Sequence, residues 1–362
     1  MGELKNWFDE KFYRQLAGQL HRQYSRFNRE IFIAGALDGL EALSLTERLR
    51  RTTTLMAEQL PSDFVRALDI LAPLAPLYEG TFKGMCFPDF VGMYGRGHFD
   101  RSLDALKYFT RYSSSEFAVR EFFKLDFQRT LDAALEWSCD ENRHVRRLAS
   151  EGSRPRLPWS FQLHTLVQDP SPVRPVLDNL KSDTEIYVRK SVANHLNDIS
   201  RDNPEIMLDW ISEWDHAIPE TSWISRHASR SLLKKCHPRA FALFGFTADP
   251  SLDVSPLRLS RTSLSLGEGQ NMSFTVTSTG TVPQKLAIDY TVHYVKKSGK
   301  RAPKVFKLKE LVLAAGATEN VAKSQTFENF TTRTHYAGRH DVDILINGKV
   351  FGTGNFELRV ST

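Results

Sequence analysis

The residues best suited to chemistry in this sequence gather in one short stretch, residues 141–159. Guanidinium groups and one aromatic ring recur within it, at Arg143, Arg146, Arg147, Arg154, Arg156 and Trp159. The first three arginines fall on a predicted helix, and the other two follow on a loop that contains two prolines. Guanidinium groups bind phosphates and an aromatic ring stacks on a base, so this stretch suits a nucleic acid. The plainer alternative is a solvated helix with a proline-rich loop.

Glu151 is the anomaly in this stretch. It lies in the last predicted turn before Gly152, which is a typical helix C-cap. A carboxylate at this end of a helix opposes the macrodipole, at a cost of up to about 1 kcal/mol. A salt bridge to Arg147, four residues earlier, would offset that cost. The functional alternative is that the site needs an anion there for a positively charged ligand.

Two further carboxylates, Glu116 and Asp198, also have a structural and a functional interpretation. Glu116 completes the pattern Ser113-Ser114-Ser115-Glu116, which is typical of a capping box at a helix start. Asp198 lies late in a predicted helix and could pair with Arg201. Trp159 could belong to the core, although its place in the loop favours exposure.

Motifs for metals and cofactors are missing from the sequence. The histidines lack metal-ligand spacing, and no HExxH, Walker or dinucleotide-binding pattern occurs. The glycines of Tyr94-Gly95-Arg96-Gly97-His98 lack the third member of a dinucleotide fingerprint, so we interpret them as a turn. We therefore expect neither a metal nor a cofactor.

The elements that must position these residues divide into two halves, the first of them helical. Apolar residues recur at helical spacing to about residue 245, and a short phrase repeats among them. Its copies are Phe117-Ala118-Val119-Arg120, His144-Val145-Arg146-Arg147, Tyr187-Val188-Arg189-Lys190 and Ile224-Ser225-Arg226-His227. The last three are 43 and 37 residues apart, close to the period of two-helix HEAT-type repeats. We predict a solenoid over residues 1–248, with the branched apolar residue of each phrase buried and the adjacent Arg or Lys facing a basic groove.

The second half has the pattern of an all-β domain. Met272, Phe274 and Val276 alternate with polar residues, and Val342, Ile344 and Ile346 lead into Asn347-Gly348, a strong hairpin signal. We predict an immunoglobulin-like sandwich over residues 255–362. The fold class is therefore mostly α: a HEAT-like helical-repeat solenoid followed by an all-β immunoglobulin-like sandwich.

Charge and composition indicate where such a chain would work. Residues 255–362 carry 15 Lys and Arg against 8 Asp and Glu, and subtraction from the totals of 48 and 43 leaves 33 against 35 for residues 1–254. A basic module beside a near-neutral one favours a polyanionic partner, although the bias is small. The beginning of the chain has no apolar signal core, no stretch is long enough to span a membrane, and the three cysteines show no disulfide framework. We expect a cytoplasmic protein that does not bind membranes.

The central phrase of the chain resembles a known family. His144-Val145-Arg146-Arg147-Leu148-Ala149-Ser150-Glu151-Gly152-x-Arg154-Pro155-Arg156-Leu157-Pro158-Trp159 is similar to the signature of the AlkC branch of the AlkC/AlkD DNA glycosylases. Ser115–Arg120 and Asn194–Asp198 fit the same branch, and the basic sandwich matches members that carry an immunoglobulin-like domain.

The resemblance implies a DNA-repair glycosylase, bacterial and associated with the nucleoid during repair. It would hydrolyse the N-glycosidic bond of cationic bases such as 3-methyladenine and 3-methylcytosine in duplex DNA, without flipping the base. By motif position, Glu116, Glu151 and Asp198 would be the carboxylates near the sugar, Trp159 would lie against the lesion, and Arg147 would help hold the backbone. No lysine belongs to this inferred site, which favours a monofunctional enzyme, and the groove alone would suffice for a monomer.

The main alternative is a noncatalytic HEAT-repeat protein that binds DNA or another protein. It shares the solenoid and the basic groove, but it needs no carboxylates there. Convergence of the three acids on one groove would favour the enzyme, whereas acids buried in salt bridges on the outer surface would favour the scaffold. A relative that recognises lesions without excising them is a further option.

Overall fold

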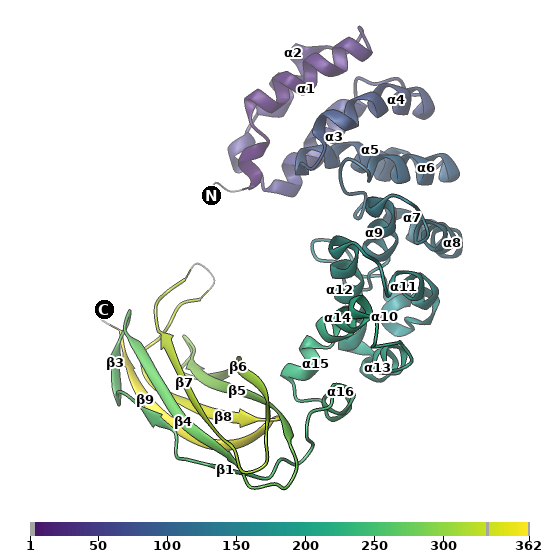
Figure 1. The fold of residues 1–362 in the computed structure, drawn as a ribbon. Helices are drawn as coiled ribbons and strands as arrows, with labels where there is room; N and C mark the ends of the chain where they lie inside the picture. Colours follow the sequence, from purple (N-terminus) through teal and green to yellow (C-terminus); the bar gives the residue numbers. More distant parts are fainter. Residues whose placement is uncertain (1–3, 331–332, 361–362) are drawn as a thin grey trace. The chain divides into compact units, whose positions relative to one another are not determined.

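The computed structural model describes residues 4–330 and 333–360, and these divide into two compact units, Met1–Ala228 and Ser229–Thr362. The first unit is helical (Figure 1). Its α-helices are α1 (Glu10–Gln23), α2 (Arg29–Leu37), α3 (Leu45–Ala57), α4 (Phe64–Leu71), α5 (Cys86–Tyr94), α6 (Phe99–Phe109), α7 (Val119–Leu125), α8 (Phe127–Trp137), α9 (Arg143–Gly152), α10 (His164–Gln168), α11 (Arg174–Leu180), α12 (Ile186–Asp202), α13 (Pro204–Ser212) and α14 (Pro219–Ala228). Short 3₁₀ helices are η1 (Leu4–Trp7), η2 (Leu40–Ala42), η3 (Ala72–Tyr78), η4 (Phe82–Met85) and η5 (Ser171–Val173).

The helices of the first unit stack in repeats, as the sequence predicts. In the part that carries the site, α9, α12 and α14 pack side by side in one row (Figure 1). The helices α8, α11 and α13 form a second row that packs against one side of the first. The branched residues of the recurring phrase, Val119, Val145, Val188 and Ile224, are all buried in this packing. The phrase lies at the start of α7, α9 and α12 but within α14, and its apolar residue is buried in every copy.

The arginines that follow Val119, Val145 and Val188 bind the backbone of loops, whereas the prediction has them facing a groove. Arg146 donates to the carbonyls of Asp140 and Glu141, and Arg189 donates to the carbonyls six and five residues before it in the same way. Arg120 is completely buried. A loop that enters a helix leaves carbonyl groups that need donors, and the guanidinium of the first helical turn reaches them. These arginines therefore hold the loops between helices.

The second unit contains a β-sandwich and two short helices. The helices are α15 (Arg230–Lys234) and α16 (Pro238–Leu243), and the strands are β1 (Leu252–Val254), β2 (Arg258–Leu259), β3 (Ser263–Ser265), β4 (Gly269–Ser278), β5 (Gln284–Val295), β6 (Arg301–Leu313), β7 (Thr318–Thr326), β8 (Gly338–Ile346) and β9 (Lys349–Arg359). One sheet has the order β3-β9-β8-β5-β6, and in the other β4 pairs with β1, β2 and β7. Val276, Ile288, Val292, Val342 and Ile344 are among the residues of the apolar core.

Local turn chemistry explains the β8–β9 hairpin. Asn347 and Gly348 have φ of 46° and 82°, as the predicted two-residue turn requires. The helices α15 and α16 fall within the predicted solenoid of residues 1–248, but Phe241 and Phe246 pack against Ala287 of β5. The second compact unit begins at Ser229.

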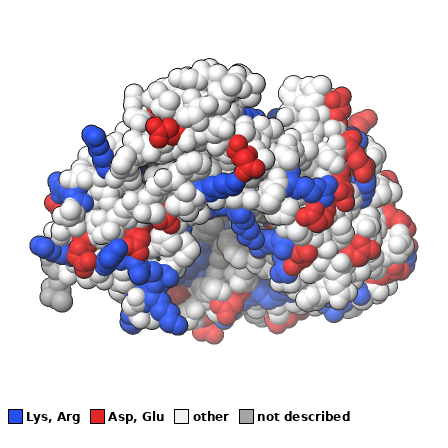
Figure 2. All heavy atoms as spheres, turned by 90° about the horizontal axis from the view of Figure 1, so that it is seen from below, with Lys and Arg blue, Asp and Glu red and all other residues white. Residues whose placement is uncertain are grey.

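Charged side chains of both signs lie interspersed on the face of the molecule shown in Figure 2. No helix among residues 4–330 and 333–360 is long and apolar enough to cross a membrane. Within the same ranges, no group of three or more histidine, cysteine or acidic side chains is arranged to hold a metal ion.

Candidate active site

A cleft of about 620 Å³ opens in the first unit between the turn before α7, the helix α9, the loop after α9 and the start of α12. Most of the residues singled out by the sequence meet there. The lining includes Glu116, Arg147, Glu151, Arg154, Trp159 and Tyr187. The cleft as a whole brings together residues that lie up to 108 positions apart in the chain, from Glu79 to Tyr187.

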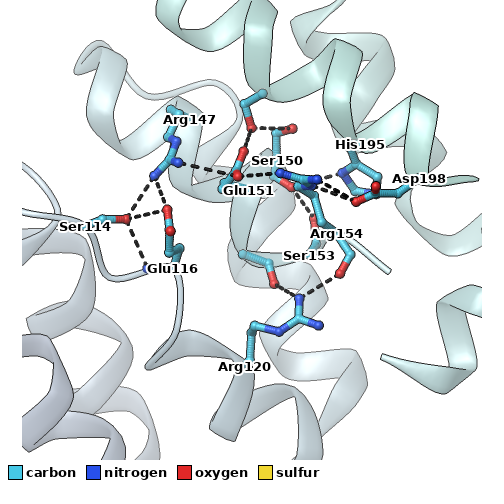
Figure 3. Close-up of polar contacts among 12 residues, drawn as sticks. Ser114, Glu116, Arg120, Arg147, Ser150, Glu151, Ser153, Arg154, His195 and Asp198 are labelled. Carbon is cyan, nitrogen blue, oxygen red and sulfur yellow. Dashed lines mark hydrogen bonds and ion pairs between the residues drawn. The ribbon is translucent and has the colours of Figure 1, made fainter. Parts of the chain in front are cut away.

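Three carboxylates and two guanidinium groups form one alternating chain of charges beside the cleft (Figure 3). Arg147 contacts Glu116 and lies 3.5 Å from Glu151, measured from Nη2 to Oε1. Arg154 Nη1 lies 2.7 Å from the same Oε1 of Glu151, and Arg154 Nη2 lies 2.8 Å from Asp198 Oδ2. Each guanidinium thus bridges two acids, and Glu151 stands in the middle.

The three predicted carboxylates differ in their access to the cleft. Glu116 and Glu151 both line it, whereas Asp198 lies behind Arg154, with 3% of its side chain exposed. The predicted convergence is therefore direct for two acids, and Asp198 joins them through a guanidinium. Because Asp198 fixes Arg154 and Arg154 contacts Glu151, the buried acid contributes to the position of the exposed one.

Glu116 does not close a capping box. The helix α7 begins at Val119, five residues later than the pattern requires, and no side chain caps it. The hydroxyl of Ser113, the capping residue of the pattern, instead donates to the carbonyl of Thr81 at 3.2 Å. The Glu116 carboxylate accepts a hydrogen bond from Ser114 and pairs with Arg147. The structural explanation from the sequence is wrong, and the side chain faces the cleft.

The protonation of Glu151 follows from opposing effects. Burial alone would raise the pKa of this carboxyl group, but the charges of Arg147 and Arg154 and the hydroxyl of Ser191, 2.5 Å away, outweigh burial and hold the pKa below its usual value. Burial raises the pKa of Asp198, and the hydrogen bonds from Arg154 and the charges of Arg154 and Arg201 offset only part of the effect. Glu151 is therefore an anion at neutral pH.

The two guanidinium groups are also held in their charged form by their neighbours. Burial would lower the pKa of Arg147, but Glu151 and Glu116 more than compensate and raise it. Burial would also lower the pKa of Arg154, but Glu151 and Asp198 outweigh burial and raise this pKa. Arg147 and Arg154 therefore remain cations through the neutral range.

The loop after α9 presents Trp159 at the edge of the cleft. Its side chain is 70% exposed, and its φ of 63° is a left-handed conformation that a residue with a Cβ rarely adopts. The expected exposure is thus observed. Strain of this kind persists only where the surrounding structure holds it, and it is concentrated at functional sites.

The remaining predicted arginines are placed differently. Arg143 lines the cleft, and its guanidinium lies 3.3 Å from Glu185 with more than half of the side chain exposed. Arg146 pairs with Asp183, and Arg156 pairs with Asp202. Their binding to phosphates stays a prediction, and Arg143 is the best placed of the three.

Sequence reasoning missed Tyr187, His144 and Ser191. Tyr187 and His144 line the cleft, their rings lie 5.5 Å apart, and the Arg147 guanidinium lies 5.3 Å from the centre of the Tyr187 ring. Both residues come directly before the branched residue of the recurring phrase, so the repeat held the signal. No sequence signal marked Ser191, because its contact with Glu151 depends on how α12 packs against α9.

These groups can stabilise positive charge. Two carboxylates, one of them buried and kept ionised by its neighbours, border a cleft that also presents aromatic faces. Charges in such a partly water-excluded site act more strongly than they would in water. The site therefore suits a reaction in which a cation binds or develops.

Comparisons with known proteins point to DNA repair. A family described as "DNA alkylation repair enzyme" matches residues 107–232, and one described as "Uncharacterised protein YhaZ, C-terminal Ig-like domain" matches residues 253–360. The chain is 42% identical to "Uncharacterized protein YhaZ" of Bacillus subtilis (strain 168) over 359 residues, 99% of this chain and 100% of that protein. It is 45% identical to Pseudomonas fluorescens alkylpurine DNA glycosylase AlkC bound to DNA containing an abasic site analog, with a TM-score of 0.95 over 99% of this chain and 100% of the other.

Proposed function

This chain belongs to the AlkC branch of the DNA alkylation repair enzymes, and from that premise we propose that it hydrolyses the N-glycosidic bond of cationic N-alkylated bases, 3-methyladenine and 3-methylcytosine, in duplex DNA. The observation that carries the proposal is the pair of carboxylates, Glu116 and Glu151, on one cleft. The coarser statement, an alkylation-repair DNA glycosylase, follows from the relative that bears this activity at 45% identity over the whole chain.

The chemistry explains why anions are needed. An N3-methylated base bears a positive charge and is already a good leaving group, and breaking its bond moves positive charge onto C1′ of the sugar. A carboxylate aimed at the sugar stabilises this transition state more than the ground state. Each tenfold gain in rate requires about 1.4 kcal/mol, so a few well-placed charges suffice for a bond that is intrinsically weak.

The geometry supports a role for each acid. Glu151, ionised and held by Arg154 and Ser191, is the best candidate to face the developing cation. Glu116 lies on the other side of Arg147, where it could orient the attacking water. Asp198 supports the constellation from behind Arg154.

The lining of the cleft also supports the remaining parts of the proposal. Trp159 would lie against the lesion, and Arg143 and Arg147 would face the backbone phosphates. No lysine is among the described residues that line the cleft, which supports a monofunctional enzyme without a Schiff-base lyase step. We place this enzyme in the bacterial cytoplasm, acting as a monomer on the nucleoid DNA, and reading the lesion without flipping it.

A noncatalytic scaffold explains less of the structure. The acids do form salt bridges, but Glu116 and Glu151 do so at a cleft and beside an exposed, strained tryptophan. A scaffold gains nothing from buried acids at a concave site, because their desolvation is costly.

Release of free bases from methylated DNA tests the proposal. We expect 3-methyladenine and 3-methylcytosine to leave the DNA, while neutral adducts such as O6-methylguanine stay, because the latter lack the positive charge. The strand should break only after alkaline treatment if the enzyme has no lyase step. Retention of both cationic bases, with DNA binding intact, would establish the scaffold instead.

A further inference from the structure

Arg120, the second residue of α7, is a buried cation whose donors are aimed at backbone. Its side chain is completely inaccessible to solvent. Nη1 donates to the carbonyl oxygens of Gly152 and Arg154, at 3.0 and 2.7 Å (Figure 3). Nη2 donates to the carbonyl oxygen of Phe161. Its guanidinium also lies 5.3 Å from the centre of the Phe161 ring. One side chain thus binds three carbonyls of a neighbouring segment.

These three carbonyls bracket the loop that builds one side of the cleft. Gly152 ends α9 directly after Glu151, and the loop between Gly152 and Phe161 carries Arg154 and Trp159. The last carbonyls of a helix have no partner within the helix, and a cation near them is favourable. Arg120 therefore caps the end of α9 from another helix, where the Glu151 carboxylate opposes the helix dipole.

The helices α7 and α9 also approach each other closely at Gly152. A Cβ atom on Gly152 would lie 2.5 Å from Cγ1 of Val119, the residue before Arg120. Both residues are buried, so the two helices touch where Arg120 crosses between them. Burial and the nearby charge of Arg154 lower the pKa of Arg120 to about 10, and the group remains a cation at neutral pH.

We propose that Arg120 is a positioning residue for base release: its three carbonyl contacts set the positions of Glu151 and of the Trp159 loop relative to the sugar of the lesion. The inference rests on the proposed glycosylase activity. Arg120 lies outside the described lining of the cleft, so its effect passes through the segment that it holds. Displacement of a reacting group by about 1 Å can lower a rate on the order of 100-fold.

Arg48 offers a matched control. It is 2% exposed and donates to three carbonyls as well, those of Leu43, Lys5 and Phe8. It is not among the described residues of the cleft. Replacement of either arginine by methionine removes a buried guanidinium that binds backbone, but only one of the two changes acts on the segment that carries Glu151.

The test is single-turnover release of 3-methyladenine from methylated DNA by the full chain, with the wild type, Arg120→Met, Arg120→Lys and Arg48→Met. We expect the rate constant of Arg120→Met to fall about 10- to 100-fold at unchanged amplitude. Arg120→Lys, which keeps the charge, should recover part of the rate. Affinity for DNA with a tetrahydrofuran abasic analogue should change less than about threefold, and Arg48→Met should keep the wild-type rate constant.

The two failures are distinguishable. No release by the wild type would remove the proposed function itself. Release by Arg120→Met with the wild-type rate constant and only a lower amplitude would overturn the positioning role, because misfolding reduces the active fraction and not the rate of each active molecule. If Arg120→Met does not fold, Arg120→Lys decides: a slower rate constant with faster amide exchange in residues 152–161 supports the inference, and wild-type values of both overturn it.

Discussion

Glu151 shows how a single residue can carry conflicting demands. Its place at the end of a helix and its burial both disfavour an anion, yet two guanidinium groups and a hydroxyl keep it charged. Removing one partner of such a buried group leaves an uncompensated charge, which costs more than the pair contributes. The constellation is therefore expected to respond as a unit, and single substitutions within it will not be additive.

A buried neutral histidine beneath this constellation predicts a pH-dependent stability. His195 is fully buried, and its Nδ1 lies 2.9 Å from the carbonyl oxygen of Ser150, which requires Nδ1 to carry the proton. Burial, together with the charge of Arg154, lowers the pKa of His195 to about 3. Between this value and the usual one, about 6.5, the unfolded chain binds a proton that the folded chain does not. The contribution of neutral His195 to the free energy of unfolding is therefore present above about pH 6.5 and is lost as the pH falls toward 3.

From pH 7 to pH 5 this histidine alone should remove about 2 kcal/mol from the free energy of unfolding. Urea unfolding at the two pH values measures the loss. The His195→Asn variant, which keeps a donor near Ser150 and cannot titrate, should lose less than the wild type. His164→Asn, a change at an exposed position, should follow the wild type. Equal losses in all three proteins would contradict this account.

At the residue scale, sequence reasoning identified Glu116, Glu151 and Trp159 because each breaks a local rule or belongs to a recognisable phrase. It could not tell that Asp198 lies behind Arg154, since the burial of a helical acid depends on which neighbouring loop covers it. Tyr187 was hidden for a similar reason: its side chain enters the cleft only because α12 packs beside α9.

At the scale of elements, α7 and α9 approach each other closely at Val119 and Gly152, next to the site. Gly152→Ala should lower the free energy of unfolding by about 1–3 kcal/mol, because its Cβ would overlap Val119, a buried branched residue that cannot move away freely. Val119→Ala should relieve the overlap, so the double variant should be less destabilised than the sum of the two single changes.

A glycine with free space around it provides the opposite expectation. Gly18 lies within α1, and an added Cβ there would meet nothing within 4 Å. Gly18→Ala should raise the free energy of unfolding by about 0.5–1 kcal/mol, because alanine is the better helix former. Thermal or urea unfolding of the two variants measures both signs, and a stable Gly152→Ala protein would contradict the close approach of the helices.

Elements with their own local signals were predictable. The Asn347-Gly348 turn adopts the positive φ values that its sequence demands, and the recurring phrase marks helices that stack on one another. The absence of a capping box at Glu116 was not predictable, because the hydroxyl of Ser113 donates to the carbonyl of Thr81 and the helix starts later. A distant carbonyl competed with the local pattern, and single-sequence rules do not see it.

At the scale of the whole molecule, the positive charge of the second unit gathers on part of one sheet. Seven of its cations lie within residues 296–309: Lys296, Lys297, Lys300, Arg301, Lys304, Lys307 and Lys309. Lys307 and Lys309 are paired with Glu310 and Glu319, whereas Lys296 and Lys297 are exposed at the end of β5. The exposed pair is therefore the better candidate for phosphates.

Replacing Lys296 and Lys297 by alanine should weaken DNA binding and make it less dependent on salt. Each lost phosphate contact lowers the slope of log affinity against log salt by about 0.9. The matched change of Lys307 and Lys309 should affect the slope less, because their carboxylate partners already compete for them. Titrations at several salt concentrations measure the slope. Equal effects of both pairs would show that overall charge, and not this site, governs binding.

The division into a helical and an all-β part followed from the change of periodicity and from the charge balance. The end of the first compact unit could not be predicted in this way, because α15 and α16 have helical spacing but pack their apolar residues against the sandwich. Which unit a short amphipathic helix joins is decided by tertiary packing, and its own sequence carries no sign of it.

Single-turnover release of 3-methyladenine by Glu151→Gln tests the central claim most directly. The variant keeps the shape of the side chain and removes its charge. We predict that it binds DNA with an abasic analogue within about threefold of the wild type and releases the base about 100-fold more slowly or worse. Glu136→Gln, at an exposed acid paired with Lys107, should retain the wild-type rate. Release by Glu151→Gln at the wild-type rate would contradict the claim that an anion in this cleft drives the reaction.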